Sequence, residues 1–248
     1  MKKVQVHQLV TLVATIGTIA VNVLANALPL NGLNTGEISD RFEIFFVPAG
    51  YVFSIWSVIY LGLLAYTVYQ ALPAQAKNPV LKKIAPYYWL ANLANAIWLF
   101  MWHYEVFSWT LPFMALILIS LLLINRNLQN VEGLSKWLVK LPFSIYLGWI
   151  SVATIANASQ WLYYIDWNGW GIEPATWAVI MLAVATALGM LMSWFENDSA
   201  YGLVLIWAFI GITVSQAATA NVVLAAWIGA ALIGIAVIGS AVRYKKVY

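Results

Sequence analysis

Eight apolar stretches, each about twenty residues long, make up most of the chain, and none carries a charged side chain in its interior. Of the 248 residues 63% are hydrophobic and 8% are charged, too little charge for a water-soluble surface. In lipid, a helix satisfies every backbone group within one segment. We therefore predict an all-α fold, a polytopic membrane bundle of about eight transmembrane helices. The predicted spans cover 7–30, 46–72, 84–103, 106–124, 139–164, 175–195, 201–219 and 222–242.

Basic residues gather in alternate loops, as the positive-inside rule predicts for an even number of spans. The charged residues of the other loops are acidic apart from Arg41. One loop on the predicted cytoplasmic side is an exception, because it carries Glu196 and Asp198 and no basic residue. We predict an integral protein of a bacterial plasma membrane with both termini cytoplasmic; seven spans is the alternative count. The basic residues assigned to the cytoplasmic side are Lys2, Lys3, Lys77, Lys82, Lys83, Arg126, Lys136, Lys140, Arg243, Lys245 and Lys246.

The absence of ionisable residues inside the spans excludes several functions. Proton-coupled transporters keep ionisable groups at membrane depth, and a retinal protein needs a buried lysine. The chain has no cysteine, and His7 and His103 lie at or beyond span ends, so we expect no bound metal or haem. No nucleophile with a paired base is visible, which argues against an enzyme. Small basic clusters at helix ends, rather than one basic face, argue against nucleic-acid binding.

Tryptophan and asparagine are prominent inside the spans, and the chain has 14 tryptophans. Several aromatic residues fit an interfacial belt at the membrane surface: Trp137, Tyr163, Tyr164, Trp167, Trp170 and Trp177. Trp56, Trp98 and Trp149 fall well inside their spans instead. At that depth aromatic rings either pack against other helices or wall a cavity.

Trp149, Ala153 and Asn157 are spaced at i, i+4 and i+8 and therefore lie along one face of a helix. A tryptophan, a small residue and an amide on one face can form a flat apolar slot with one polar group, suited to a rigid planar or steroid-like molecule. The same residues suit helix packing, because alanine admits a neighbouring helix and asparagine bonds across the contact. The residues alone leave both interpretations open.

Three local motifs extend this pattern. They are Pro-Ala-Gly-Tyr-Val-Phe-Ser-Ile-Trp at 48–56 with Tyr60, Ala-Asn-Ala-Ile-Trp at 94–98 with Phe100, and Tyr-Leu-Gly-Trp at 146–149 with Ala153, Thr154 and Asn157. Together they resemble the TspO and mitochondrial benzodiazepine receptor family, also called tryptophan-rich sensory proteins. The resemblance covers residues 1–170, a five-helix transmembrane unit. Beyond residue 170 the resemblance offers nothing, and the predicted spans make residues 171–248 three additional transmembrane helices with a short basic cytoplasmic tail.

The chain departs from the family pattern near the ligand pocket of that family. The paired prolines before the second helix are Pro48 and Ala49 here, and one residue is missing between Phe53 and Trp56. Ile145 replaces the proline before the Tyr-Leu-Gly-Trp motif. The first loop, which covers the pocket in the family, is also different. These changes put the identity of the ligand in doubt.

The resemblance implies a membrane receptor or carrier-like protein for a hydrophobic planar ligand, because the ligands of the family include porphyrins and sterols. No cofactor is expected beyond a porphyrin or another tetrapyrrole as that ligand. The alternatives are a transporter or exporter of such a molecule, or a non-catalytic assembly or regulatory subunit. The expected pocket opens toward the loop at 31–45 and is lined by Phe53, Trp56, Tyr60, Asn95, Trp98, Trp109, Trp149, Ala153 and Asn157.

Small residues at helical spacing occur in the last two spans and favour close helix packing. They either join these two spans to each other, which the short connection favours, or form the face of a homodimer. Membrane lipid and the hydrophobic ligand are the other expected partners. The small residues are Gly211, Ser215, Thr219, Ala226, Ala230 and Gly234.

Overall fold

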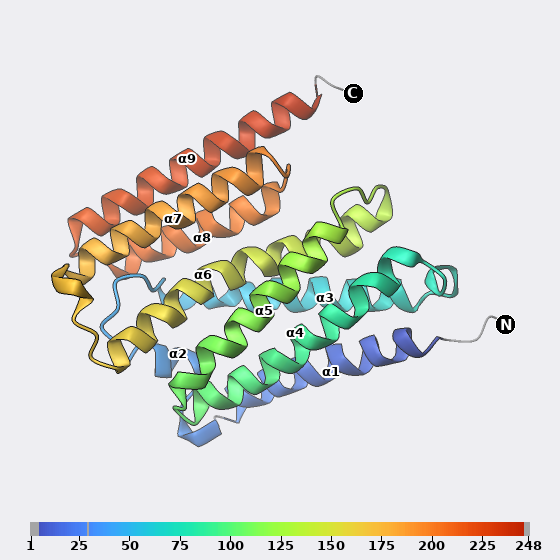
Figure 1. Ribbon diagram of the computed structural model, residues 1–248, viewed down its shortest axis with the longest axis horizontal. Coiled ribbons are helices and arrows are strands. Elements are labelled where there is room, and N and C mark those ends of the chain that lie inside the picture. Colours follow the sequence, from blue (N-terminus) through green and yellow to red (C-terminus); the bar gives the residue numbers. More distant parts are fainter. Residues whose placement is uncertain (1–4, 29, 246–248) are drawn as a thin grey trace. The chain divides into compact units, whose positions relative to one another are not determined.

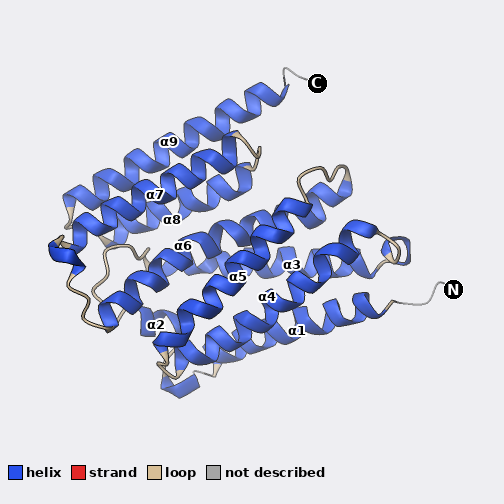
Figure 2. Ribbon diagram, in the orientation of Figure 1, coloured by secondary structure: helices blue, strands red, loops and turns tan. Residues whose placement is uncertain are grey.

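The computed structural model describes residues 5–28 and 30–245, and these residues are helical without a strand among them (Figures 1 and 2). The basic residues Lys2, Lys3 and Lys246, used to predict the topology, lie outside these ranges. The long helices are α1 (Val6–Ala27), α3 (Ile55–Ala71), α4 (Pro79–His103), α5 (Phe107–Asn127), α6 (Leu141–Tyr164), α7 (Pro174–Trp194), α8 (Ser199–Ser215) and α9 (Ala220–Lys245). A short α2 (Thr35–Ser39) and a π-helical turn at Lys136–Lys140 complete the main elements.

The eight long helices coincide with the eight predicted spans, which confirms a polytopic membrane bundle. Six of them are long and apolar enough to cross a bilayer. The exceptions have visible causes. Helix α8 has 17 residues and is therefore about 25 Å long, short of a bilayer core. Helix α4 begins earlier than predicted, where Asn78 accepts hydrogen bonds from the backbone N–H groups of Val80 and Leu81, and so includes Lys82 and Lys83.

The second span differs from its prediction at its start. Residues 46–49 are not helical, and Gly50–Ser54 form a 3-10 turn before α3 begins at Ile55. Pro48 cannot donate a backbone hydrogen bond, and the next N–H, that of Ala49, donates to the carbonyl of Gly211 instead (3.1 Å). Residues 46–49 are therefore irregular despite their apolar composition, and Phe46 and Pro48 among them are buried.

The chain divides into two compact units. The first contains residues 1–41 and 56–147, and the second contains 42–55 and 148–248. In the first unit, α1 and α5 both pack against α4, as Figure 1 shows. In the second unit, α7, α8 and α9 pack against one another. The predicted division into a five-helix unit at 1–170 and additional helices at 171–248 stays a prediction.

Helix α1 has its polar face buried and its apolar face exposed, the reverse of a soluble amphipathic helix. Val13 and Ile16 are exposed, as residues facing lipid should be. The buried residues are Gln8, Thr11, Thr15, Thr18, Asn22 and Ala25. These polar groups meet partners on α3 and α4, so α1 is held in the first unit by hydrogen bonds across helices.

The centre of this interface is a triad of hydroxyl groups. The Thr15 hydroxyl lies 2.8 Å from both the Thr67 hydroxyl on α3 and the Tyr88 hydroxyl on α4. At one end Gln8 and Gln70 each donate to the backbone carbonyl of the other. All five of these residues are buried. The triad therefore joins three helices at one point in the apolar interior.

We expect Thr15→Val to lower the free energy of unfolding by about 1–2 kcal/mol, because it leaves the buried Tyr88 hydroxyl without this partner. Valine keeps the shape of threonine, so packing is preserved. The measurement is the thermal or detergent unfolding of the purified protein, with the exposed Thr176→Val as the control. Equal melting temperatures of the two variants would show that the triad contributes nothing.

In the second unit the small residues of α8 serve a contact other than the predicted one. A side chain at Gly211 would meet Pro48 and Val52, and the Ser215 hydroxyl donates to the carbonyl of Val47 (2.5 Å). Helices α8 and α9 do pack against each other, but Gly211 and Ser215 themselves contact the segment 47–52. Gly234 on α9 has no side chain or backbone within 4 Å of its added Cβ position.

Candidate functional site

Four of the predicted site residues lie in the second unit. Trp149, Ala153 and Asn157 form a stripe along one face of α6, called the α6 stripe below, and Phe53 lies in the segment before α3. Trp149 is 2% exposed and Asn157 is 3% exposed, with Ala153 half-buried between them. The ring of Phe53 meets Trp149 edge to face, with centroids 5.6 Å apart at 81°. An aromatic pair, a small residue and an amide therefore lie in the second unit.

Helix α8 holds the segment that carries Phe53. Trp207 donates its indole N–H to the carbonyl of Val52 (3.2 Å), and Gln216 donates its amide to the carbonyl of Ile44 (3.3 Å). With the Gly211 and Ser215 contacts, these bonds fix the backbone at several points on either side of Pro48. Such fixation limits the positions available to the Phe53 ring.

Gln160 belongs to the same face of α6 and was missed in the sequence. It follows Asn157 by three residues and is 1% exposed, yet its amide nitrogen and oxygen have no hydrogen-bond partner among the described residues. Its spacing could have indicated this position, because Gln160 follows Trp149 by eleven residues and so lies on the same helix face. Only the structure, however, shows that the amide is buried and unpaired.

The other predicted site residues belong to the first unit, and two of them stack. The rings of Trp56 and Tyr60 lie 5.5 Å apart and 24° from parallel. Trp56 also contacts Tyr146 of α6, with centroids 5.8 Å apart. Trp56, Tyr60 and Tyr146 therefore form a local aromatic cluster between α3 and α6.

Asn95, Trp98 and Trp109 have separate surroundings. The Asn95 side-chain oxygen accepts a hydrogen bond from Asn22 of α1 (2.8 Å), which is a helix-joining contact. Trp98 is 8% exposed and stacks on Trp102, with centroids 5.3 Å apart. Trp109 is 57% exposed, unlike a residue that walls an enclosed cavity. Asn95 therefore takes part in the contact between α1 and α4, and Trp98 in an aromatic stack on α4.

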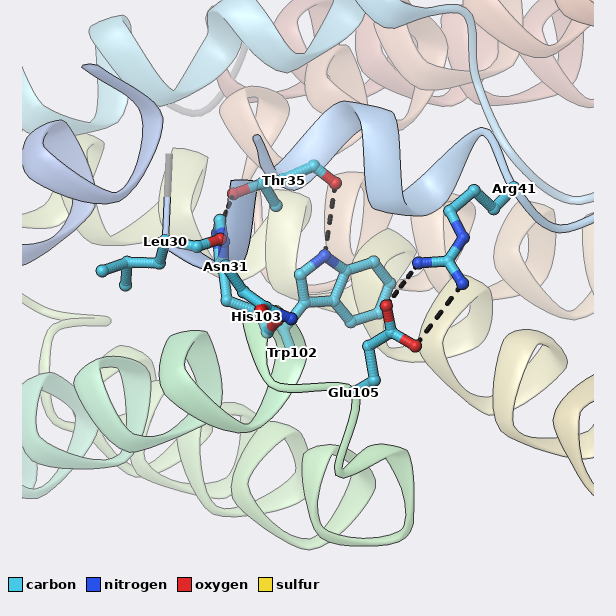
Figure 3. A network of polar contacts seen from close by, with 7 residues as sticks. All are labelled: Leu30, Asn31, Thr35, Arg41, Trp102, His103 and Glu105. Atoms are coloured by element: carbon cyan, nitrogen blue, oxygen red, sulfur yellow. Dashed lines mark hydrogen bonds and ion pairs between the residues drawn. The ribbon is translucent and has the colours of Figure 1, made fainter. Parts of the chain in front are cut away.

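The loop that was expected to cover the pocket is fastened to the end of α4 (Figure 3). The fully buried His103 has its Nδ1 3.1 Å from the carbonyl of Leu30 and its Nε2 3.1 Å from the hydroxyl of Thr35. Trp102 donates its indole N–H to the carbonyl of Thr35 (3.2 Å), and the Asn31 amide donates to the carbonyl of His103 (3.2 Å). Four hydrogen bonds thus attach residues 30–35 to α4.

Arg41 and Glu105 form an ion pair at the edge of this network (Figure 3). Hydrogen bonding to the Glu105 carboxylate raises the pKa of Arg41 above its ordinary value. Both side chains are well exposed, so solvent screens the pair and it contributes little to stability.

No group of three or more His, Asp or Glu side chains in the described part of the chain could hold a metal ion. The α6 stripe of Trp149, Ala153 and Asn157 presents an aromatic ring, a small side chain and a neutral amide.

The helical architecture and these residues together define a polytopic α-helical membrane protein with an aromatic and amide stripe on α6. The chain belongs to the family of TSPO-like proteins, whose model matches residues 8–239. The match continues well past residue 170, where the resemblance was expected to end. Searches of curated proteins and of solved structures found no match. Membership places this chain in a family associated with small hydrophobic ligands.

Proposed function

We propose that the protein is a membrane receptor or carrier-like protein that binds a hydrophobic planar ligand, a porphyrin or a sterol-like molecule, at the stripe on α6. The observation that carries the proposal is the Phe53–Trp149 pair beside Ala153 and Asn157. An edge-to-face aromatic pair offers a flat ring surface, and asparagine offers a donor and an acceptor. Helix α8 supports this site by holding the segment 47–52.

A titration of the purified protein with protoporphyrin, followed by tryptophan fluorescence, tests binding. We expect saturable quenching, since Trp149 would lie against the bound ring. Linear quenching without saturation, equal to that of free tryptophan in the same detergent, would contradict the proposal. Counterflow of the porphyrin in vesicles that contain the protein would then separate a carrier, which exchanges the ligand across the bilayer, from a receptor, which does not.

We further propose a bacterial plasma membrane with both termini cytoplasmic, which puts Lys77 inside the cell. Because the chain has no cysteine, single cysteines report the side directly. In intact cells an impermeant thiol reagent should leave Lys77→Cys unlabelled and should label Glu173→Cys, which is exposed in the loop before α7. Labelling of the cysteine at position 77 from outside would refute this topology.

A further inference from the structure

The side chain of Gln160 has two buried polar atoms without a hydrogen-bond partner among the described residues of the second unit. Its side-chain donor and acceptor are both buried, and neither has a partner among the described residues. Buried polar groups are almost always paired, and lipid offers them no substitute. Ser193 and the indole N–H of Trp161 also lack partners, but each is one group, whereas Gln160 presents a donor and an acceptor side by side.

The position of Gln160 links it to the stripe. Trp149, Ala153, Asn157 and Gln160 follow one another at intervals of four, four and three residues on an uninterrupted helix, so they share one face. The rise from Ala153 to Gln160 is about 10 Å, a length that a polycyclic planar molecule can bridge. One molecule that lies on Trp149 and Ala153 can therefore extend toward the Gln160 amide.

The charge of the surroundings restricts the group that can pair with this amide. Helices α6, α7 and α8 contain no Asp, Glu, Lys or Arg. A carboxylate brought here would be desolvated without a countercharge, which is costly. A neutral group that offers an acceptor and a donor side by side, as a cyclic cis-amide does, would form two hydrogen bonds with the Gln160 amide at once.

We infer that Gln160 recognises a lactam, or another neutral cis-amide, at one edge of the ligand. The inference rests on the proposed function, because it assumes that a planar ligand lies along the α6 stripe. It adds the chemical class of the polar group that the ligand presents. Since both amide atoms are enclosed, the ligand reaches them by displacing a neighbouring side chain.

The test uses two planar probes on the full-length protein in detergent: phenanthridinone, a lactam, and N-methylphenanthridinone, which lacks the donor. We expect the lactam to bind the wild-type protein at least tenfold more tightly, measured by tryptophan fluorescence. In Gln160→Met, which keeps the length of the side chain without its hydrogen-bonding groups, the preference should disappear. Without ligand, this variant should melt at the same temperature as the wild type or higher, because an unpaired buried amide is removed.

Equal affinities of the two probes for the wild-type protein would overturn the inference without any variant. A preference that persists in Gln160→Met would also overturn it. A lower melting temperature with an unchanged preference would assign Gln160 to packing. If protoporphyrin binds and both probes fail, only this inference falls; if protoporphyrin and both probes all fail to bind, the proposed function falls with it.

Discussion

Leucine in place of Ala153 should weaken porphyrin binding about tenfold or more, which corresponds to roughly 1–3 kcal/mol of overpacking. Ala153 is half-buried on α6 between Trp149 and Asn157, and three added carbons would occupy the gap that a planar ring needs. The helix itself should survive, because leucine favours helices and is compatible with lipid. Fluorescence titration gives the affinity, and a thermal melt of the same sample gives the stability.

The matched control is Ala158→Leu. Ala158 is also half-buried on α6 but lies about 140° around the helix from Ala153. It should leave porphyrin affinity unchanged. If α6 uses Ala153 only to pack against a neighbour, Ala153→Leu will melt at a lower temperature while its affinity stays normal. That result would remove Ala153 from the site.

Alanine in place of Gly211 should lower the free energy of unfolding by about 1–3 kcal/mol, the usual cost of overpacking. The added Cβ would lie 2.9 Å from the Pro48 Cβ and closer still to Val52, so the segment 47–52 must move away from α8. The backbone bond from Ala49 to Gly211 would lengthen with it. Because Phe53 follows directly, we expect porphyrin affinity to fall as well.

Gly234→Ala on α9 is the control for this change, since an added Cβ there meets no atom within 4 Å. Replacing a helical glycine in open space should leave stability unchanged or raise it by up to about 1 kcal/mol. Similar melting temperatures for Gly211→Ala and Gly234→Ala would show that α8 does not fix the segment 47–52.

The positions of the long helices could be predicted because long apolar runs leave a chain in lipid little choice but to form helices. The same composition failed at 46–49, where the apolar residues Phe46 and Pro48 are buried in an irregular segment. Apolar composition indicates that a segment avoids water, but it does not show whether the segment is helical. The hydrogen bond from the Ala49 N–H to the Gly211 carbonyl, which shows that the chain is not helical at this point, is visible only in the structure. The reversed polarity of α1 was present in its spacing of Thr and Asn, but its partners Thr67 and Tyr88 are distant in sequence.

The candidate site could be predicted where its residues lie on one helix. The stripe from Trp149 to Asn157 follows from helical geometry alone. The motif at 48–56 supplied Phe53, and the structure adds its edge-to-face contact with Trp149. Asn95 shows the limit of motif reasoning, because its amide is engaged by Asn22. Gln160 could not be singled out in advance, since an unpaired amide is a property of its surroundings and not of its spacing.

A structure of the full-length protein with protoporphyrin bound directly tests whether a planar ligand lies against the α6 stripe. We expect a porphyrin ring in contact with Trp149 and Ala153 on α6, with the Phe53 ring displaced or repacked from its present edge-to-face position. A porphyrin seated elsewhere on the protein, with the Phe53–Trp149 pair unchanged at 5.6 Å, would contradict it.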